Sequence, residues 1–314
     1  MTVSIIIVNY KTPAVLKDCV ESVISIEKDT EFEIIIVDND SRDGSEDVIK
    51  SLSEKYEKVK PVYLKSRISF SAANNMGFEE SKGEFILIMN PDIIFSEPLL
   101  KRLTESMISP ANTGAVCPKL TGSDGKFQYR YFQRYPSVMQ FILFYSFAAK
   151  LFENSGYLKN KYLCDYTINL NSGKSERTDQ IPCAFFFTRR DIFEESGRMN
   201  ESYELFFEDV DLSYRISKKH DLKVDTSMKV THLGGESFKT DDDYWLHGRF
   251  IMSMIKFFEN NYGAMRTLLL KVCVYANSLT VISGEYIKSI AGKKNSYRLK
   301  KHKYLISEFN KTIF

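Results

Sequence analysis

The chain has 314 residues, of which 43% are hydrophobic and 27% charged, and its formal net charge is +2. These fractions are those of an ordinary globular protein, with a length somewhat above that of one average domain. So small a net charge excludes a strong overall attraction to nucleic acid, and we expect no nucleic-acid partner.

The cysteines and the N-terminal residues indicate in which cellular compartment the protein is found. Five cysteines are an odd number without a close pair, so they indicate neither a zinc site nor a disulfide framework, which fits a reducing compartment. Residues 1–10 lack the basic and apolar regions of a signal peptide. No run of about 18 uninterrupted apolar residues occurs, so we expect no spanning helix. We therefore predict a cytoplasmic protein.

Strand patterns alternate with helical patterns over the first 90 residues. Apolar, β-branched runs predict buried strands, and apolar residues spaced by three and four predict helices. The predicted strands are residues 3–8, 32–37, 59–64 and 85–89; the predicted helices start at Pro13, follow the polar loop 38–45, and cover residues 71–81. This alternation predicts an α/β fold with a mostly parallel sheet and helices on both faces.

Polar side chains follow three of these strands where each strand ends. Asn9 and Tyr10 follow the first strand, Asp38 the second, and Asp92 comes after Pro91, which has no N–H to continue a strand. Each loop alone is most simply a solvated turn, but three at the same sheet edge favour a ligand cleft. The glycine-rich phosphate loops are absent, so a nucleotide bound here would be held by carboxylates, amides and a metal.

Six ordered segments carry a resemblance to a known family. They are residues 4–10 (Ser-Ile-Ile-Ile-Val-Asn-Tyr), 36–45 (Ile-Val-Asp-Asn-Asp-Ser-Arg-Asp-Gly-Ser), 70–77 (Phe-Ser-Ala-Ala-Asn-Asn-Met-Gly), 90–92 (Asn-Pro-Asp), 206–215 (Phe-Phe-Glu-Asp-Val-Asp-Leu-Ser-Tyr-Arg) and 230–232 (Val-Thr-His). Together they resemble family 2 glycosyltransferases of the GT-A fold, most of all the rhamnosyltransferase-like enzymes of bacterial surface polysaccharide synthesis. The resemblance covers roughly residues 3–240. Three segments depart from the family pattern, namely residues 67–70, 183–184 and 198–201, which leaves the identity of the donor open.

The resemblance implies a nucleotide-sugar site with a divalent metal. Asp38 would accept from the imide N–H of a uracil or thymine ring, unless it is only a turn residue before a helix. Asp92 would bind Mg²⁺ or Mn²⁺ on the diphosphate, with Asn90 in the first position of the metal motif, and His232 would add a ligand. The implied nucleotide-sugar contacts are Val8, Asn9, Tyr10, Asp38, Arg67, Asn74, Asn90 and Asp92.

The resemblance also implies a catalytic base. Asp209 would lie at the amino end of a helix, where the helix dipole favours its ionised form, and would take the proton of the acceptor hydroxyl. Glu208 and Asp211 would lie on the acceptor side; Asp211 is the rival base, and a helix cap is the alternative role. One base without an enzyme nucleophile implies a single displacement with inversion.

The middle and the end of the chain suggest contact with an amphiphile. Residues 127–166 hold thirteen aromatic residues interleaved with five lysines and arginines, which suits a lipid-linked acceptor at a membrane surface or an ordinary packed insertion. Residues 268–290 form an apolar helical pattern, followed by the basic residues Lys293, Lys294, Arg298, Lys300, Lys301 and Lys303. This tail resembles a peripheral anchor to anionic lipid, with a solvated face or a dimer contact as the alternatives.

These observations predict a GT-A domain over residues 1–245, with a nucleotide-binding half at about 1–120 and an acceptor half at about 121–245, and a helical, basic extension over 246–314. The predicted reaction is transfer of a sugar, with rhamnose as the first choice, from a dTDP or UDP donor to a lipid-diphosphate-linked glycan. A sugar-1-phosphate nucleotidyltransferase, which would need a glycine-rich first loop, and a non-catalytic nucleotide-sugar binding module are the alternatives. The oligomeric state is not indicated by the sequence.

Overall fold

The computed structural model describes residues 2–108, 112–164, 167–234, 243–290, 292 and 296–311. The chain forms two compact units that are interleaved in sequence. The first, here called the sheet unit, comprises Met1–Gln133, Asp165–Ser202 and Glu208–Lys239. The second, the helical unit, comprises Arg134–Cys164, Tyr203–Phe207 and Thr240–Phe314.

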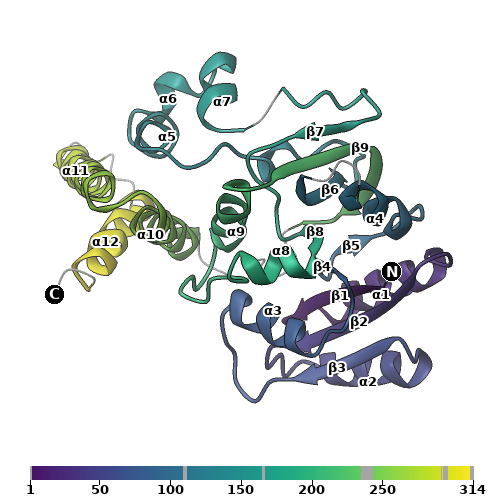
Figure 1. The fold of residues 1–314 in the computed structure, drawn as a ribbon. Helices are drawn as coiled ribbons and strands as arrows, with labels where there is room; N and C mark the ends of the chain where they lie inside the picture. The colour runs from purple at the N-terminus through teal and green to yellow at the C-terminus, as the bar shows by residue number, and fades with distance from the viewer. Residues whose placement is uncertain are drawn as a thin grey trace. The chain divides into compact units, whose positions relative to one another are not determined.

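The sheet unit contains a nine-stranded sheet within the described residues (Figure 1), in the order β3-β2-β1-β4-β8-β6-β9-β5, with β7 pairing with β9. The strands are β1 (Thr2–Asn9), β2 (Glu31–Asp38), β3 (Val59–Tyr63), β4 (Phe85–Met89), β5 (Ile93–Ile94), β6 (Thr113–Thr121), β7 (Ser175–Arg177), β8 (Phe185–Arg189) and β9 (Asp221–His232). The half formed by β3, β2, β1 and β4 is parallel, and β8 then runs antiparallel between β4 and β6. The predicted mostly parallel sheet is confirmed, and the four predicted strands lie within two residues of their predicted bounds.

Helices cover both faces of the parallel half. Ile34 and Ile36 of β2 belong to the same buried cluster as residues of α1 and α2, whereas Ile35 and Val37 pack with Ala73 of α3. The helices of this unit are α1 (Pro13–Ile26), α2 (Ser45–Lys55), α3 (Phe70–Glu79), α4 (Leu100–Ile108), η1 (Tyr129–Tyr131), α8 (Arg190–Glu195) and α9 (Glu208–Ser217). Because the strands are buried on both faces, they are continuous apolar runs rather than alternating ones.

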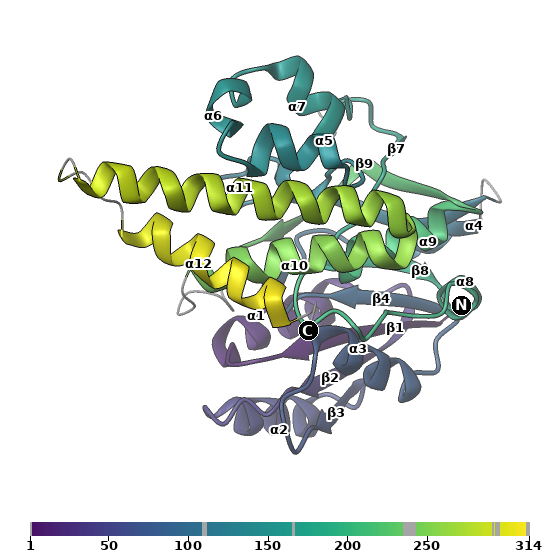
Figure 2. The same cartoon turned by 90° about the vertical axis from the view of Figure 1, so that its left-hand side faces the viewer.

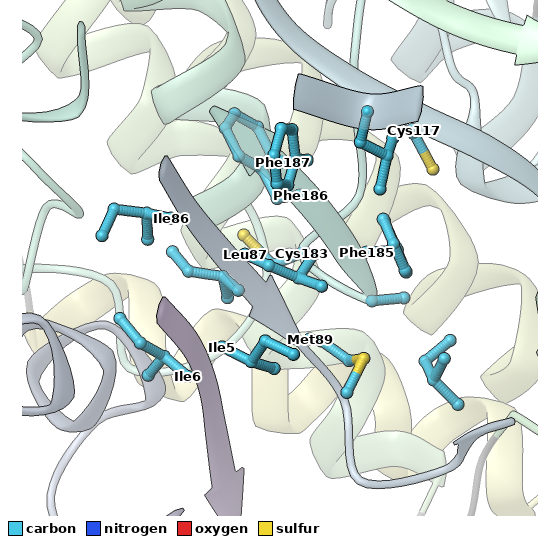
Figure 3. Close-up of a cluster of buried hydrophobic side chains, with 14 of the residues drawn as sticks. Ile5, Ile6, Ile86, Leu87, Met89, Cys117, Cys183, Phe185, Phe186 and Phe187 are labelled. Carbon is cyan, nitrogen blue, oxygen red and sulfur yellow. The ribbon is translucent and has the colours of Figure 1, made fainter. Parts of the chain in front are cut away.

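The core lies where β1, β4 and β8 meet (Figure 3). Leu87 of β4 is paired with Ile5 of β1 on one side and with Phe187 of β8 on the other, and all three side chains are fully buried. Gly77 lets α3 lie directly on the sheet, because an added Cβ would be 2.6 Å from the Cγ2 of Ile6. Tight packing at this centre fixes the strand ends that carry the polar residues.

The helical unit contains two groups of helices. The first is α5 (Val138–Gln140), η2 (Phe141–Tyr145), α6 (Ala149–Phe152) and α7 (Gly156–Tyr162). The second is α10 (Asp243–Asn261), α11 (Ala264–Ile290) and α12 (Ser296–Lys311). Both views show α5 beside α11 and α12 packed against α10 and α11 (Figures 1 and 2). Residues 134–164 and the C-terminal helices, far apart in sequence, therefore belong to one unit.

Candidate active site

The ends of β1 and β2 are joined by a buried polar network. The register pairs Asn9 with Asp38, and the Nδ2 of Asn9 donates to the Oδ1 of Asp38 at 2.8 Å and to the hydroxyl of Ser41 at 3.1 Å. Ser41 donates to Asp38 twice, from its hydroxyl to Oδ1 at 2.6 Å and from its backbone N–H to Oδ2 at 3.1 Å. The hydroxyl of Thr12 donates to the Oδ1 of Asn9 at 2.9 Å. A carboxylate has about four lone-pair sites, so Asp38 keeps one free acceptor site, on Oδ2.

The accessible side chains at this edge lie outside that network. The guanidinium of Arg67 is stacked over the ring of Tyr10, 4.2 Å from its centroid, and Nη1 lies 3.4 Å from the Tyr10 hydroxyl. The amide of Asn39 holds the loop that carries Arg67, because it exchanges hydrogen bonds of 2.9 Å with both the N–H and the C=O of Ile68. Arg67 and Tyr10 therefore form an exposed aromatic and cationic surface beside the buried Asp38.

Two of the residues predicted to contact the nucleotide-sugar donor are buried. Val8 and Asn74 are buried, and the Nδ2 of Asn74 donates to the carbonyl of Phe70 in its own helix at 2.9 Å. The Oδ1 of Asn74 is also buried and has no hydrogen-bond partner within the described part of the chain. Asn90, at the end of β4, is partly exposed, and its backbone N–H donates to the carbonyl of Ala184 at 3.1 Å.

Asp92 lies between two strands of the sheet and is buried. β4 ends at Met89, and the two-residue strand β5 begins at Ile93 and pairs antiparallel with the end of β9, where Ile93 is opposite His232. The backbone N–H of Gly234 donates to the Oδ2 of Asp92 at 2.9 Å, which leaves Oδ1 buried and without a hydrogen-bond partner in the described residues. The pairing of β5 with β9 thus brings Asp92 close to His232, which lies 140 positions further along the chain.

Gln128 determines which nitrogen of His232 carries the proton. Its Nε2 donates to the backbone carbonyl of His232 at 2.9 Å, and since a carbonyl only accepts, this contact orients the Gln128 amide. The Oε1 of Gln128 then lies 2.8 Å from the Nδ1 of His232 and can only accept. Nδ1 therefore carries the hydrogen in the neutral imidazole, and Nε2 presents a lone pair.

That lone pair faces the unpartnered carboxylate oxygen. The Nε2 of His232 lies 3.4 Å from the Oδ1 of Asp92. The ring of Tyr131 packs edge-on against the imidazole, with 4.9 Å between centroids, and fixes its plane. Two buried acceptor atoms that face each other without a hydrogen between them are unfavourable unless a cation or a proton joins them. Asp92 and His232 could therefore hold a divalent cation, and no third His, Cys, Asp or Glu joins them in the described ranges.

Glu208 and Asp209 open α9 as a pair of neighbouring carboxylates. Burial, followed by the negative charge of Asp209, raises the pKa of Glu208 to about 8, and its Oε2 has no hydrogen-bond partner among the described residues. Burial also raises the pKa of Asp209 above its ordinary value, although backbone N–H groups of Val210 and Cys183 donate to it. The predicted position at the amino end of the helix is confirmed, but the predicted net effect on the pKa is wrong, because desolvation outweighs the helix dipole.

The two acids divide into a protonated and an ionised partner. Like charges this close cannot both be present in a buried site, so the pair retains one proton near neutral pH. Glu208, whose pKa is raised to about 8 by burial and by the charge of Asp209, is the partner that favours the proton. The chain enters α9 through Phe206 and Phe207, whose φ angles of 66° and 68° are uncommon for residues other than glycine.

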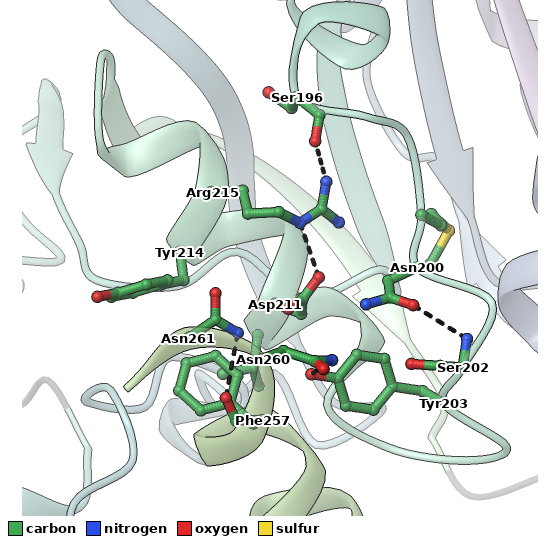
Figure 4. A network of polar contacts seen from close by, with 12 residues as sticks. Ser196, Asn200, Ser202, Tyr203, Asp211, Tyr214, Arg215, Phe257, Asn260 and Asn261 are labelled. Carbon is green, nitrogen blue, oxygen red and sulfur yellow. Dashed lines mark hydrogen bonds and ion pairs between the residues drawn. The ribbon is translucent and has the colours of Figure 1, made fainter. Parts of the chain in front are cut away.

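Asp211 is engaged elsewhere (Figure 4). Its Oδ2 accepts from the Nε of Arg215 at 2.7 Å, and Arg215 also donates to the carbonyl of Ser196. Asp211 is buried and lies one turn before Arg215 on the same helix. This contact gives Asp211 a structural role in holding Arg215.

A separate cleft of about 620 Å³ lies between α3 and the segment that follows α8. Asn75 of α3 crosses its floor and bonds to the carbonyl of Met199 at 2.9 Å and to the carboxylate of Glu201 at 2.8 Å. None of the predicted site residues lines this cleft, so it is distinct from the cluster at the strand ends. The unpartnered or perturbed acidic groups described above, Asp92, Glu208 and Asp209, lie outside this cleft.

Gln128, Tyr131 and Ser41 are site residues that the sequence patterns do not reveal. Ser41 stands three residues after Asp38 in an Asp-Asn-Asp-Ser loop, which is a signal for a local side-chain to backbone bond. Gln128 and Tyr131 lie in the aromatic stretch and carry no such signal. The burial of Phe132 and its stacking on Phe127, with 5.1 Å between centroids, shows that this part of the stretch is ordinary packing.

Comparison with known proteins gives one family and several relatives. The profile of Glycosyl transferase family 2 matches residues 4–197. An uncharacterized glycosyltransferase of Nostoc sp. is 33% identical over 106 residues, which is 33% of this chain and 32% of that protein. The poly(ribitol-phosphate) beta-glucosyltransferase of Bacillus spizizenii is 33% identical over 106 residues, 32% of this chain and 16% of that protein. The chain thus spans about a third or less of the length of these two relatives.

Solved structures share the fold at low sequence identity. GalNAc-T7, crystallised with UDP, GalNAc and Mn²⁺, has a TM-score of 0.62 at 15% identity over 82% of this chain and 48% of its own. The mannosyltransferase PcManGT of Pyrobaculum calidifontis, in complex with GDP-Man and Mn²⁺, has a TM-score of 0.55 at 13% identity over 99% of this chain and 87% of its own. The predicted GT-A architecture with C-terminal helices is confirmed.

Proposed function

The chain belongs to glycosyl transferase family 2, and from this premise we propose that it transfers a sugar from a nucleotide-diphosphate donor to a glycan acceptor. The observation that carries the proposal is the facing pair of Asp92 Oδ1 and His232 Nε2, two buried atoms 3.4 Å apart, with the other ring nitrogen of His232 held by Gln128. The pair lies just past the carboxyl end of β4, the edge where open α/β sheets hold their ligands.

The residues present fit a divalent metal on the donor diphosphate. Asp92 offers an unpartnered carboxylate oxygen and His232 a lone pair whose ring is oriented by Gln128, as metal-bound histidines usually are. One carboxylate and one imidazole, with phosphate oxygens and water, make a sufficient shell for Mn²⁺ or Mg²⁺, and the imidazole favours Mn²⁺. The metal would stabilise the negative charge that develops on the leaving nucleoside diphosphate. Mn²⁺ is present in two solved structures with this fold, GalNAc-T7 and PcManGT.

Asp209 is the proposed base. Its carboxylate takes the proton of the acceptor hydroxyl while that oxygen bonds to the anomeric carbon and the bond to the diphosphate oxygen breaks. Burial raises the pKa of Asp209, which makes the carboxylate a stronger base than an exposed aspartate, and the proton retained by Glu208 keeps Asp209 ionised. The step is a single displacement with inversion, and NMR of the first linkage formed would contradict it by showing the retained anomer.

The donor is proposed to be dTDP-rhamnose or a UDP-sugar. Asp38 keeps one acceptor site on Oδ2 for the imide N–H of uracil or thymine, and Asn9 and Ser41 hold the carboxylate in place. Tyr10 and Arg67 form an exposed stacked pair beside it that suits the base or a phosphate. Rhamnose rests on the resemblance of the sequence motifs alone. The proposed acceptor is a lipid-diphosphate-linked glycan, with the protein at the cytoplasmic face of the membrane.

Isothermal titration with UDP, dTDP, GDP and CDP, each with and without Mn²⁺, tests these assignments. We expect binding of dTDP or UDP that strengthens with Mn²⁺ and loses this metal dependence in Asp92→Ala. Asp209→Asn should bind the donor as the native protein does and lose turnover. Binding of GDP alone would contradict the role of Asp38, and the absence of any binding would indicate a non-catalytic module.

A further inference from the structure

The outward face of α11 is a long, uncharged stripe. Its residues recur every three or four positions over the 27-residue helix, which is about 40 Å long, and so lie on one side of it. The large apolar members are between 38% and 90% exposed. The stripe comprises Met265, Leu268, Leu269, Val272, Tyr275, Ala276, Leu279, Thr280, Ser283, Tyr286, Ile287 and Ile290. In Figure 2 this helix runs across the picture above α10 and α12.

The inward face of the same helix is mixed, because polar residues are buried there beside Leu270, Val274 and Val281. Asn277 accepts from the backbone N–H of Phe147 at 2.8 Å, and the hydroxyl of Ser278 lies 3.2 Å from the Nδ1 of His302. Glu285 is buried and paired with Lys288 at 3.0 Å and with Arg298 at 3.8 Å. A helix in water buries its apolar side and exposes its polar side. α11 exposes large apolar side chains and keeps polar groups inside, which fits a helix whose outer face contacts something apolar.

The charge around the stripe is positive. Residues 243–314 contain twelve lysines and arginines and four aspartates and glutamates, a net charge of +8, and the remaining 242 residues carry −6 because the whole chain is +2. The ammonium of Lys303 on α12 lies 5.3 Å from the ring centroid of Tyr286, which is in the stripe. Lys293 and Lys294 of the predicted basic segment lie outside the described residues. A basic surface beside an apolar one matches an anionic lipid headgroup layer.

The helical unit has a second group of exposed apolar residues with basic residues nearby in the sequence. Phe147, Leu151 and Tyr157 are exposed at 56%, 80% and 72%, and the basic residues of this segment are Lys150, Lys159 and Lys161. The hydrogen bond from Phe147 to Asn277 ties this segment to the middle of α11. Tyr166, which belongs to the predicted aromatic stretch, lies outside the described residues. Residues 134–164 of the aromatic stretch and the basic tail are thus parts of one amphiphilic unit.

We propose that α11 lies in the interface of an anionic bilayer, with its uncharged stripe in the acyl boundary and the neighbouring lysines and arginines among the headgroups. α11 is long and apolar enough to cross a bilayer by length and composition, but every 18-residue segment of it contains at least one of Lys271, Glu285 and Lys288, which a span would place in hydrocarbon. A second copy is a poorer occupant, because it would bring two segments of charge +8 together. The proposal concerns a surface and holds whatever reaction the sheet unit performs.

Vesicle flotation of the full chain tests this inference. We expect binding to vesicles with roughly 30 mol% phosphatidylglycerol, weak binding to pure phosphatidylcholine, and release at about 500 mM salt, where the Debye length is short. Leu268→Glu with Val272→Glu should lower the partition coefficient about tenfold or more, because two exposed apolar contacts are replaced by charges that the anionic surface repels. Ile108→Glu, an equally exposed apolar site on α4, should not change it.

The following outcomes would contradict the proposal. Absence of binding to anionic vesicles, or equal loss in Ile108→Glu, would remove α11 as the lipid surface. Resistance of the bound protein to carbonate extraction would indicate a spanning helix. A dimer in light scattering that the α11 double variant dissociates would show that a second copy covers the stripe. Far-UV circular dichroism of the variants confirms that they fold, and donor titration confirms that the sheet unit is intact.

Discussion

Replacement of Gln128 by Leu is expected to weaken metal binding without touching a metal ligand. Gln128 makes two contacts with His232, from Nε2 to the backbone carbonyl at 2.9 Å and between Oε1 and Nδ1 at 2.8 Å. Leucine fills a similar volume and makes neither contact, so the imidazole is no longer held in one tautomer and one orientation. Loss of such a supporting hydrogen bond typically lowers metal affinity 10–100-fold, which corresponds to about 1.4–2.7 kcal/mol.

Titration of Mn²⁺ followed by electron paramagnetic resonance measures this affinity directly, in the presence of UDP or dTDP and independently of turnover. Gln133→Leu is the matched control, since Gln133 lies five residues further on and donates to the carbonyl of Arg130. We expect the native affinity in Gln133→Leu and a 10–100-fold loss in Gln128→Leu. Native affinity in Gln128→Leu would refute the assignment of His232 as an oriented ligand, as would an equal loss in both variants.

The carboxylates of α9 give three further predictions. Asp209→Asn should lower kcat by at least about 10²-fold with an unchanged donor Kd, since it removes a general base and keeps the shape; single-turnover kinetics with calorimetry separates the two. Glu208→Gln should have a higher free energy of unfolding than the native protein at pH 9, because the raised pKa of Glu208 makes the stability of the native protein fall as the pH rises from about 4.5 through about 8; an identical pH dependence in urea melts would contradict it. Asp211→Asn should cost about 2 kcal/mol of stability, because it breaks the buried pair with Arg215, and should keep the activity of the folded fraction; a selective loss of kcat would show that Asp211 is the base.

The position of Asp92 follows from the sequence, and its partner does not. An apolar run closed by Pro91 predicts a carboxylate at the end of a central strand, and that is where Asp92 lies. His232 reaches it because Ile93 and Ile94 form a two-residue strand that pairs antiparallel with β9. Two residues give no periodicity to detect, and pairing across 140 positions is a property of the whole sheet. Only the family resemblance could associate the two residues beforehand.

The pKa values of the carboxylates at the start of α9 are a second property that a local sequence pattern does not predict. The position of Asp209 at the amino end of a helix is readable from the pattern that runs through Leu212 and Ile216, and the helix dipole lowers a pKa there. The net direction is the opposite, because Asp209 and Glu208 are enclosed by the fold and lie next to each other. Desolvation depends on what the fold places around a carboxylate, which no window of sequence contains.

In the C-terminal tail, the fold resolves a sequence pattern that is ambiguous by itself. In the sequence, Lys271, Glu285 and Lys288 interrupt the apolar run and make it a poor membrane segment by continuity alone. In the structure all three lie off the outward stripe: Glu285 is buried and pairs with Lys288 and Arg298, whose side chains are 53% and 39% exposed, and Lys271 pairs with Glu259 of α10 at 2.7 Å. Each of the three charges therefore has an ion-pair partner, and the outward stripe is left without charge. Exposure of the apolar stripe of α11 to water is unfavourable. It is explained if the stripe contacts another apolar surface.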